Sequence, residues 1–241
     1  MNELADINRR LTWRYFFRGQ LQHLLLLLVL VPGGIALAEP GLTGGFWLGV
    51  SDRQWTYRLM SVVVIHQFWV WLVWRAQLCF GTFSRLFGRA DLTVWMVTFL
   101  PFLVARVVMT IAVANSTPGT LEMPSWVALI LGTLLFVPAV YTIWSTFRYF
   151  GLARAAGGDH FRTRYRAMPL VNQGAFRYSS NAMYAFGLLV LWTIALWAQS
   201  RAALAMALFQ HAYIWVHLYC TEAPDMDVLY GDANDADLQK E

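Results

Sequence analysis

Mainly apolar stretches follow one another along the chain and are separated by short polar connections. They lie near 20–38, 57–80, 92–114, 125–147, 182–199 and 201–220. A helix that crosses a membrane needs about 20 apolar residues, and helices satisfy their own backbone hydrogen bonds in lipid. The pattern therefore predicts an all-α, polytopic transmembrane helix bundle of about six spans. Only Ser200 and Arg201 interrupt the last two stretches, which predicts a tight helical hairpin.

The composition agrees with a membrane location. Hydrophobic residues make up 58% of the chain and charged residues only 13%, against about 25% charged residues in an average soluble domain. The length of 241 residues gives room for one bundle, so a single membrane domain is expected. Within it, 1–147 would form a four-helix scaffold and 148–231 the catalytic part. The acidic segment 232–241 would be a solvated, partly disordered tail.

The positive charges predict the orientation of the bundle. The net charge is +4, and the Arg residues stand mainly between the apolar stretches rather than on one soluble stripe, so no nucleic-acid partner is expected. Alternate connections place thirteen Arg residues on one side and three on the other. The larger group comprises Arg9, Arg10, Arg14, Arg18, Arg75, Arg85, Arg89, Arg148, Arg154, Arg162, Arg164, Arg166 and Arg177, and the smaller group Arg53, Arg58 and Arg201. Because cytoplasmic connections carry excess basic residues, both termini and the connection 148–181 are predicted to be cytoplasmic.

Polar side chains converge at the inner ends of the last two spans. Residues at spacings of three and four share one face of the last helix, namely Gln210, Tyr213, His217 and Thr221. An antiparallel hairpin would set Tyr184 at about the depth of His217. Glu222 follows at the helix exit, in a chain otherwise poor in acids. A polar stripe in a membrane faces protein or a cavity, so the segment from His160 to Gly231 is the candidate site.

Two polar residues in other spans favour a simpler interpretation. Arg106 and His66 would fit an arginine that extends to the outer interface and a histidine satisfied by a neighbour, rather than a buried pair that shapes an acceptor tunnel. The five His residues show no metal-ligand spacing, so no metal is expected. No P-loop, dinucleotide-binding or nucleophile-elbow motif is present.

Three runs in the C-terminal half carry a family resemblance. They are GDHF at 158–161, GAFRYSSNAMYAFG at 174–187 and YCTEAPDMDVLYG at 219–231. In order and spacing they resemble the phospholipid methyltransferase and isoprenylcysteine carboxyl methyltransferase superfamily of integral membrane enzymes. Ser180 and Ala182 stand where that superfamily usually has Arg and Pro, and Arg177 is the candidate substitute for the Arg.

The resemblance implies an S-adenosylmethionine-dependent methyltransferase with its donor pocket at the cytoplasmic face. Glu222 would then bind the donor's amino group or ribose, and Arg177 its carboxylate. Asn181, Tyr184 and His217 would line the pocket, and His160 would close it from the water side. Glu222 or His217 would accept a proton from an amine acceptor, and the sequence does not choose between them.

The resemblance also implies a lipid or lipidated acceptor, with the amino headgroup of phosphatidylethanolamine or its methylated derivatives expected first. An isoprenylcysteine-type carboxyl methyltransferase is the alternative within the superfamily, and related membrane sterol reductases are more distant. A small transporter or non-catalytic scaffold is the rival from another class. The expected location is a bacterial inner membrane or the endoplasmic reticulum membrane.

Overall fold

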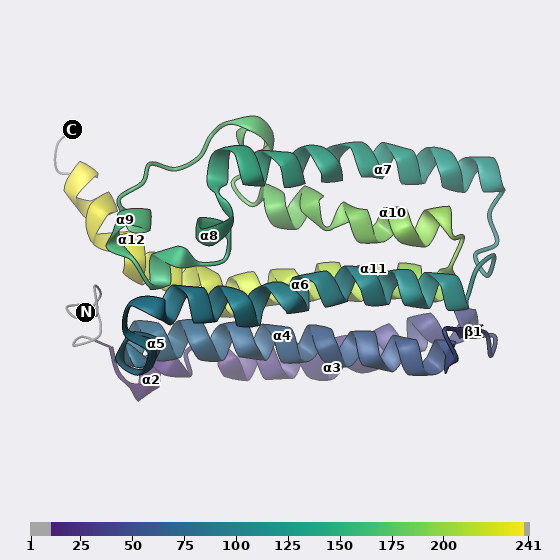
Figure 1. The fold of residues 1–241 in the computed structure, drawn as a ribbon, viewed down its shortest axis with the longest axis horizontal. Helices are drawn as coiled ribbons and strands as arrows, with labels where there is room; N and C mark the ends of the chain where they lie inside the picture. The colour runs from purple at the N-terminus through teal and green to yellow at the C-terminus, as the bar shows by residue number, and fades with distance from the viewer. Residues whose placement is uncertain (1–10, 239–241) are drawn as a thin grey trace.

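A computed structural model describes residues 11–238 of the chain, and the side chains of residues 11–231 (Figure 1). The predicted all-α class is confirmed, since long helices form a bundle and one short hairpin supplies the strands β1 (Phe46–Trp47) and β2 (Val50–Ser51). The α-helices are α2 (Trp13–Phe16), α3 (Gln20–Ala38), α4 (Asp52–Phe80), α5 (Thr82–Phe87), α6 (Asp91–Ser116), α7 (Ser125–Ser145), α8 (Leu152–Ala155), α9 (Thr163–Arg166), α10 (Leu189–Trp197), α11 (Arg201–His217) and α12 (Ala223–Leu238).

Shorter helical turns join these helices. Turns of the 3₁₀ type are η1 (Glu39–Gly41), η2 (Gly88–Ala90), η4 (Gly158–His160) and η5 (Gly174–Arg177). Turns of the π type are η3 (Thr146–Phe150), η6 (Met183–Gly187) and η7 (Leu218–Glu222). Each π turn directly precedes or follows a long helix, which places an extra residue in the turn where that helix begins or ends.

Four helical stretches are long and apolar enough to cross a membrane, judged by length and composition over the described residues. They are Trp13–Gly41, Asp52–Phe80, Thr82–Ser116 and Ser125–Phe150. Of the two further spans predicted from the sequence, η6 with α10 forms a shorter apolar helix, Met183–Trp197. The other lies in the 17-residue α11, which is not among the apolar helices by length and composition. Both run lengthwise within the bundle beside the longer helices (Figure 1).

Local sequence explains where α4 begins and ends. The Ser51 hydroxyl accepts the Gln54 N–H, and the Gln54 side chain accepts the Ser51 N–H, which makes a capping box. Gly81, with φ of +61°, ends the helix in the left-handed conformation that glycine adopts without strain. The capping box starts α4 at Asp52, five residues before the apolar pattern predicts.

The hairpin between α10 and α11 turns at Ser200, as the sequence predicts. The Ser200 hydroxyl accepts the Ala203 N–H and caps α11. It also lies 2.6 Å from the Thr117 hydroxyl at the end of α6. The second contact joins the turn between α10 and α11 to the end of α6.

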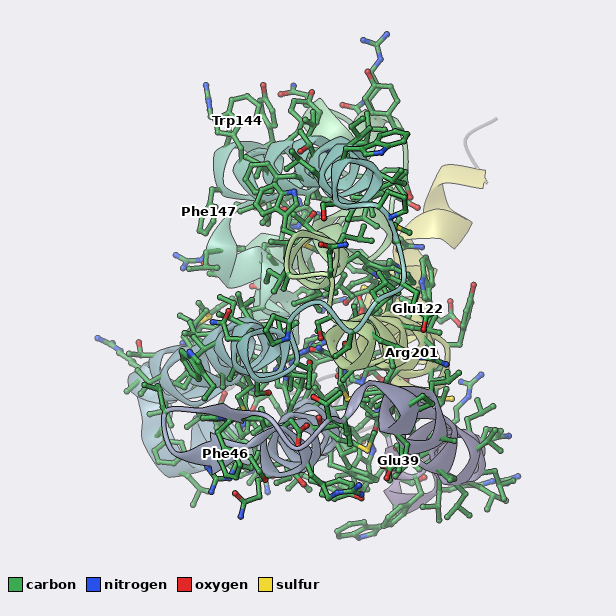
Figure 2. All side chains as sticks on the ribbon, turned by 90° about the vertical axis from the view of Figure 1, so that its right-hand side faces the viewer. Glu39, Phe46, Glu122, Trp144, Phe147 and Arg201 are labelled. Carbon is green, nitrogen blue, oxygen red and sulfur yellow. The ribbon has the colours of Figure 1, made fainter. Side chains whose placement is uncertain are left out.

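The helices pack in pairs that leave α7 on one side of the bundle. In Figure 1, α7 lies along α10, α10 along α11, and α4 and α6 run together beside α3. Figure 2 looks along the helices from the end that carries Glu39, Glu122 and Arg201, and shows Trp144 of α7 and Phe147 of the adjoining turn η3 at the edge of the bundle. The helix α11 contacts α3, α4, α6 and α10, so protein covers most of its surface.

The connection 148–181 folds back against the end of the bundle near α12. Gly157 has φ of +77°, and a Cβ atom there would lie 2.5 Å from the indole of Trp74. Only glycine fits such a close approach. At the same end, α12 continues to Leu238 where the sequence predicts a partly disordered tail, while residues 239–241, Arg9 and Arg10 lie outside the described residues.

Candidate functional site

A hydrogen bond between Tyr184 and Glu222 joins the start of the α10 stretch to the end of α11. Tyr184 lies in the π turn η6, Glu222 ends the π turn η7, and the tyrosine hydroxyl donates to the Glu222 carboxylate. Turns of this kind occur frequently at functional sites, because the extra residue redirects neighbouring side chains. The antiparallel hairpin predicted from the sequence therefore brings these two candidates together.

The Glu222 carboxyl is set to exchange a proton near neutral pH. It is half-buried just beyond α11. Burial raises its pKa to about 7, although the hydrogen bond from Tyr184 acts in the opposite direction. A carboxyl with a pKa near the operating pH is suited to general acid–base work.

A cavity of about 270 Å³ lies beside this pair, between α4, α6, α7, η6 and α11. Tyr184 and His217 both line it, as does Trp74 from α4. His217 is only 2% exposed, and neither of its ring nitrogens has a hydrogen-bond partner. The cavity therefore presents an unpaired imidazole next to the hydrogen-bonded Tyr184–Glu222 pair.

Arg106 and His66 also line this cavity, so the expectation of an interfacial arginine and a satisfied histidine is wrong. Arg106 is 4% exposed, and its Nε donates to Gln210 Oε1 at 3.0 Å. Gln210 in turn donates to the Thr110 hydroxyl at 3.0 Å. Because α11 offers an acceptor at this depth, the guanidinium stays inside the bundle. Neither ring nitrogen of His66 has a partner.

His160 lies behind the cavity wall rather than on it. Its ring stacks on the Trp74 indole with centroids 4.4 Å apart. Its nitrogens lie 3.1 Å from Asp159 Oδ1 and 3.4 Å from Asp225 Oδ2. Burial disfavours the imidazolium, but the two carboxylates outweigh burial and raise the pKa of His160 to about 9. Trp74 therefore lies between His160 and the cavity.

Asp225 belongs to a buried ion cluster that the sequence did not predict. Its Oδ1 lies 2.7 Å from Arg75 Nε, and both side chains are fully buried. The hydroxyl of Tyr15 donates to the same carboxylate at 3.0 Å. Two features of the sequence could have indicated this cluster. They are Arg75 within the second apolar stretch and Asp225 after the last one. The cluster links α2, α4, η4 and α12 directly behind Trp74.

Arg177 and Asn181, like His160, are not among the residues that line the cavity. Arg177 is exposed and is not among the lining residues, because Ala175 and Phe176 turn inward and leave the next residue outside. Asn181 is half-buried, and its backbone carbonyl accepts the N–H groups of Tyr184 and Ala185 at the start of η6. Of the five residues of the predicted wall, Tyr184 and His217 line the cavity, and Glu222 is joined to it through the hydrogen bond with Tyr184.

Metal-ligating side chains do not gather in the part of the chain that the structure describes. Among the described residues, no cluster of three or more His, Cys, Asp or Glu side chains could hold a metal ion. The titratable groups of the site are instead paired with each other or face the cavity.

The fold and the site define a helical membrane protein with a titratable pair beside an interior cavity. The family model described as phospholipid methyltransferase matches residues 127–233, so the resemblance to this superfamily of membrane methyltransferases is confirmed over that segment. The matched segment contains most of α7 and all of η6, α10, α11 and η7, and therefore Tyr184, His217 and Glu222. Comparison with curated proteins and with solved structures gives no match.

Proposed function

We propose that this protein transfers a methyl group from S-adenosylmethionine to an acceptor embedded in the membrane. The observation that carries the proposal is the Tyr184–Glu222 pair beside a cavity with an unpaired His217, all within the family-matched segment 127–233. The amino headgroup of phosphatidylethanolamine or of its methylated derivatives is the acceptor we expect.

Residues beside the cavity fit such a donor in three respects. S-adenosylmethionine, when bound, supplies a methyl group activated by a positively charged sulfur. Glu222 offers a half-buried carboxylate to its amino group or ribose, and the rings of Trp74 and Tyr184 offer faces to its positive sulfur. The unpaired nitrogens of His217 and Trp74 offer hydrogen bonds. Arg177 was expected to bind the carboxylate of the donor, but it is exposed and lies outside the cavity lining, so we assign it no such role.

The cavity volume supports separate positions for the two proposed reactants. A volume of about 270 Å³ lies just below the roughly 300–1,000 Å³ of typical ligand pockets, so the cavity holds the reacting part of the acceptor and not both reactants. The bulk of the donor would then lie at the rim formed by Glu222 and the connection 148–181. Positioning the acceptor atom in line at about 3–3.5 Å is the main work of such a site.

Glu222 is the residue we assign as proton acceptor. An amine must lose a proton when its nitrogen takes the methyl group from sulfur, and a carboxyl with a pKa near 7 can take that proton at neutral pH. Tyr184 positions the carboxylate through its hydrogen bond. The excess of Arg at this end of the bundle would place the site on the cytoplasmic side.

The test is binding and turnover with the purified full-length protein. Calorimetry with S-adenosylhomocysteine should show binding to the wild type, and labelled methyl groups should enter a total lipid extract. Glu222→Gln should lower turnover by about 10²–10⁴-fold, the usual contribution of a general base. The control, Glu122→Gln, alters an exposed carboxyl at the opposite end of the bundle and should change neither result (Figure 2).

The pH profile separates a role for Glu222 from a structural effect. Turnover in the wild type should rise through about pH 7 as the Glu222 carboxyl loses its proton. Because the Tyr184 hydrogen bond lowers this pKa, Tyr184→Phe should move the rise to higher pH. A folded wild type that binds no S-adenosylhomocysteine would refute the proposed function, and an unmoved profile in Tyr184→Phe would remove Glu222 as the base.

A further inference from the structure

Unpaired polar atoms are concentrated on the wall of the interior cavity. Six cavity-lining residues of the described part of the chain carry a buried side-chain nitrogen or oxygen without a hydrogen-bond partner: His66, Gln67, Trp74, Arg106, Thr142 and His217. The remaining atom of this kind, Arg75 Nε, lies in the ion pair with Asp225. Folded proteins pair nearly all buried polar groups, so this concentration indicates a ligand that pairs them.

The cavity wall carries the positive charge of Arg106, and no acidic residue that lines the cavity compensates it. Arg106 Nε donates to Gln210, but its Nη2 has no partner. No acidic residue is among those that line the cavity, and a guanidinium keeps its charge at any ordinary pH. A buried charge without a partner is costly. The ligand that best offsets this cost carries a negative charge.

The unpaired groups are mostly hydrogen-bond donors. The side-chain nitrogens of Arg106, Gln67 and Trp74 only donate, whereas the imidazoles and the Thr142 hydroxyl can donate or accept. A group with several acceptor oxygens, such as a phosphate or a carboxylate, complements this set. Arg pairs with both through two parallel hydrogen bonds.

The cavity reaches an exposed apolar part of the bundle surface. Leu103 from α6 and Ile143 and Phe147 from the α7 side line the cavity, and they are also 37%, 39% and 61% exposed on the bundle surface. Figure 2 shows Phe147 on the outer face of this side of the bundle. The rest of the lining is mainly apolar. A hydrocarbon chain could therefore leave the cavity between α6 and α7.

We infer that Arg106, His66 and Gln67 form a subsite for the oxyanion of an amphiphilic ligand whose apolar chain leaves between α6 and α7. The oxyanion is a phosphate or a carboxylate. That this ligand is the methyl acceptor rests on the proposed function, while the subsite itself does not. On that function, the acceptor's reacting atom would face Tyr184 and Glu222, and its anionic group would lie deeper in the bundle.

The experiment measures binding of three matched single-chain probes to the full-length protein in a neutral maltoside detergent. Lauric acid, lauryl phosphate and lauryl alcohol share one hydrocarbon chain and differ in the polar group. Native mass spectrometry gives the affinity of each probe for the wild type, Arg106→Gln and Arg201→Gln. The last variant is the control, since Arg201 is exposed at the outer end of the bundle (Figure 2).

At least one of the two acids should bind about tenfold or more tightly than the alcohol to the wild type and to Arg201→Gln, the effect of about one charge-assisted hydrogen bond. Arg106→Gln should lose this preference. If that variant does not fold, Gln67→Leu should reduce the same preference. Equal binding of the alcohol and the acids to the wild type would overturn the inference. An unchanged preference for the acids in folded Arg106→Gln, or in Gln67→Leu if the first variant does not fold, would also overturn it.

The acid that binds identifies the source of the oxyanion. Preference for lauryl phosphate indicates a phospholipid headgroup, and preference for lauric acid indicates a lipid carboxylate. S-adenosylhomocysteine binding is measured on the same samples and should be unchanged in Arg106→Gln. If the wild type does not bind S-adenosylhomocysteine, the methyltransferase proposal fails. If the wild type shows no preference for an acid over the alcohol, the subsite fails.

Discussion

Removing the charge of Asp225 should destabilise the protein strongly, although the residue lies outside the cavity. Asp225 pairs with Arg75 at 2.7 Å, with both side chains fully buried, and accepts a hydrogen bond from Tyr15 at 3.0 Å. Asp225→Asn leaves the Arg75 charge buried without its counterion. Breaking one partner of such a pair costs about 3–5 kcal/mol. At about 2–4 °C per kcal/mol for a chain of this size, the Tm should fall by about 6–20 °C.

Thermal unfolding in detergent, followed by circular dichroism, measures this effect. The control is Asp227→Asn on the same helix, which changes an exposed carboxyl and should shift the Tm by less than about 2 °C. The double variant Arg75→Met, Asp225→Leu should recover much of the loss, since apolar residues of similar size often replace a buried ion pair without cost. Equal Tm values for Asp225→Asn and Asp227→Asn would refute the reasoning.

Two further predictions concern the connection that covers Trp74. Because the pKa of His160 is raised from 6.5 to about 9, its contribution to stability should be complete below pH 6.5 and lost as pH rises through about 9. Melting temperatures across this range should fall in the wild type but not in His160→Gln, and parallel curves would contradict the assignment. Gly157→Ala would place a Cβ 2.5 Å from the Trp74 indole at φ of +77°, so it should cost about 1–3 kcal/mol. Gly231→Ala, with open space around its Cβ, is the matched control, and equal unfolding midpoints would show that Gly157 is not constrained.

The buried ion cluster gives the cavity a rigid boundary. His160 stacks on one face of Trp74 and is itself held by Asp159 and Asp225. Trp74 in turn lines the cavity beside His217, with ring centroids 5.7 Å apart. A fixed indole keeps the cavity shape constant, and a methyl transfer that depends on alignment needs such constancy.

The sequence alone determined the helices and the end of the bundle where the chemistry is expected. Apolar stretches near 20–38 and 125–147 coincide closely with α3 and α7, because burial of backbone in lipid requires helices of that length. The antiparallel hairpin also followed, since only two residues break the last two apolar stretches, but the sequence set Tyr184 level with His217 and the structure joins it to Glu222.

Only the tertiary structure decided which polar side chains face one another across helices that are distant in sequence. Arg106 lies inside the bundle because α11 presents Gln210 at its depth, and Arg177 lies outside because its neighbours Ala175 and Phe176 turn inward. Helical periodicity fixes the face of a residue within its own helix, but not the rotation of one helix against the next. The cavity and its unpaired groups depend on that rotation, and so the sequence could not predict them.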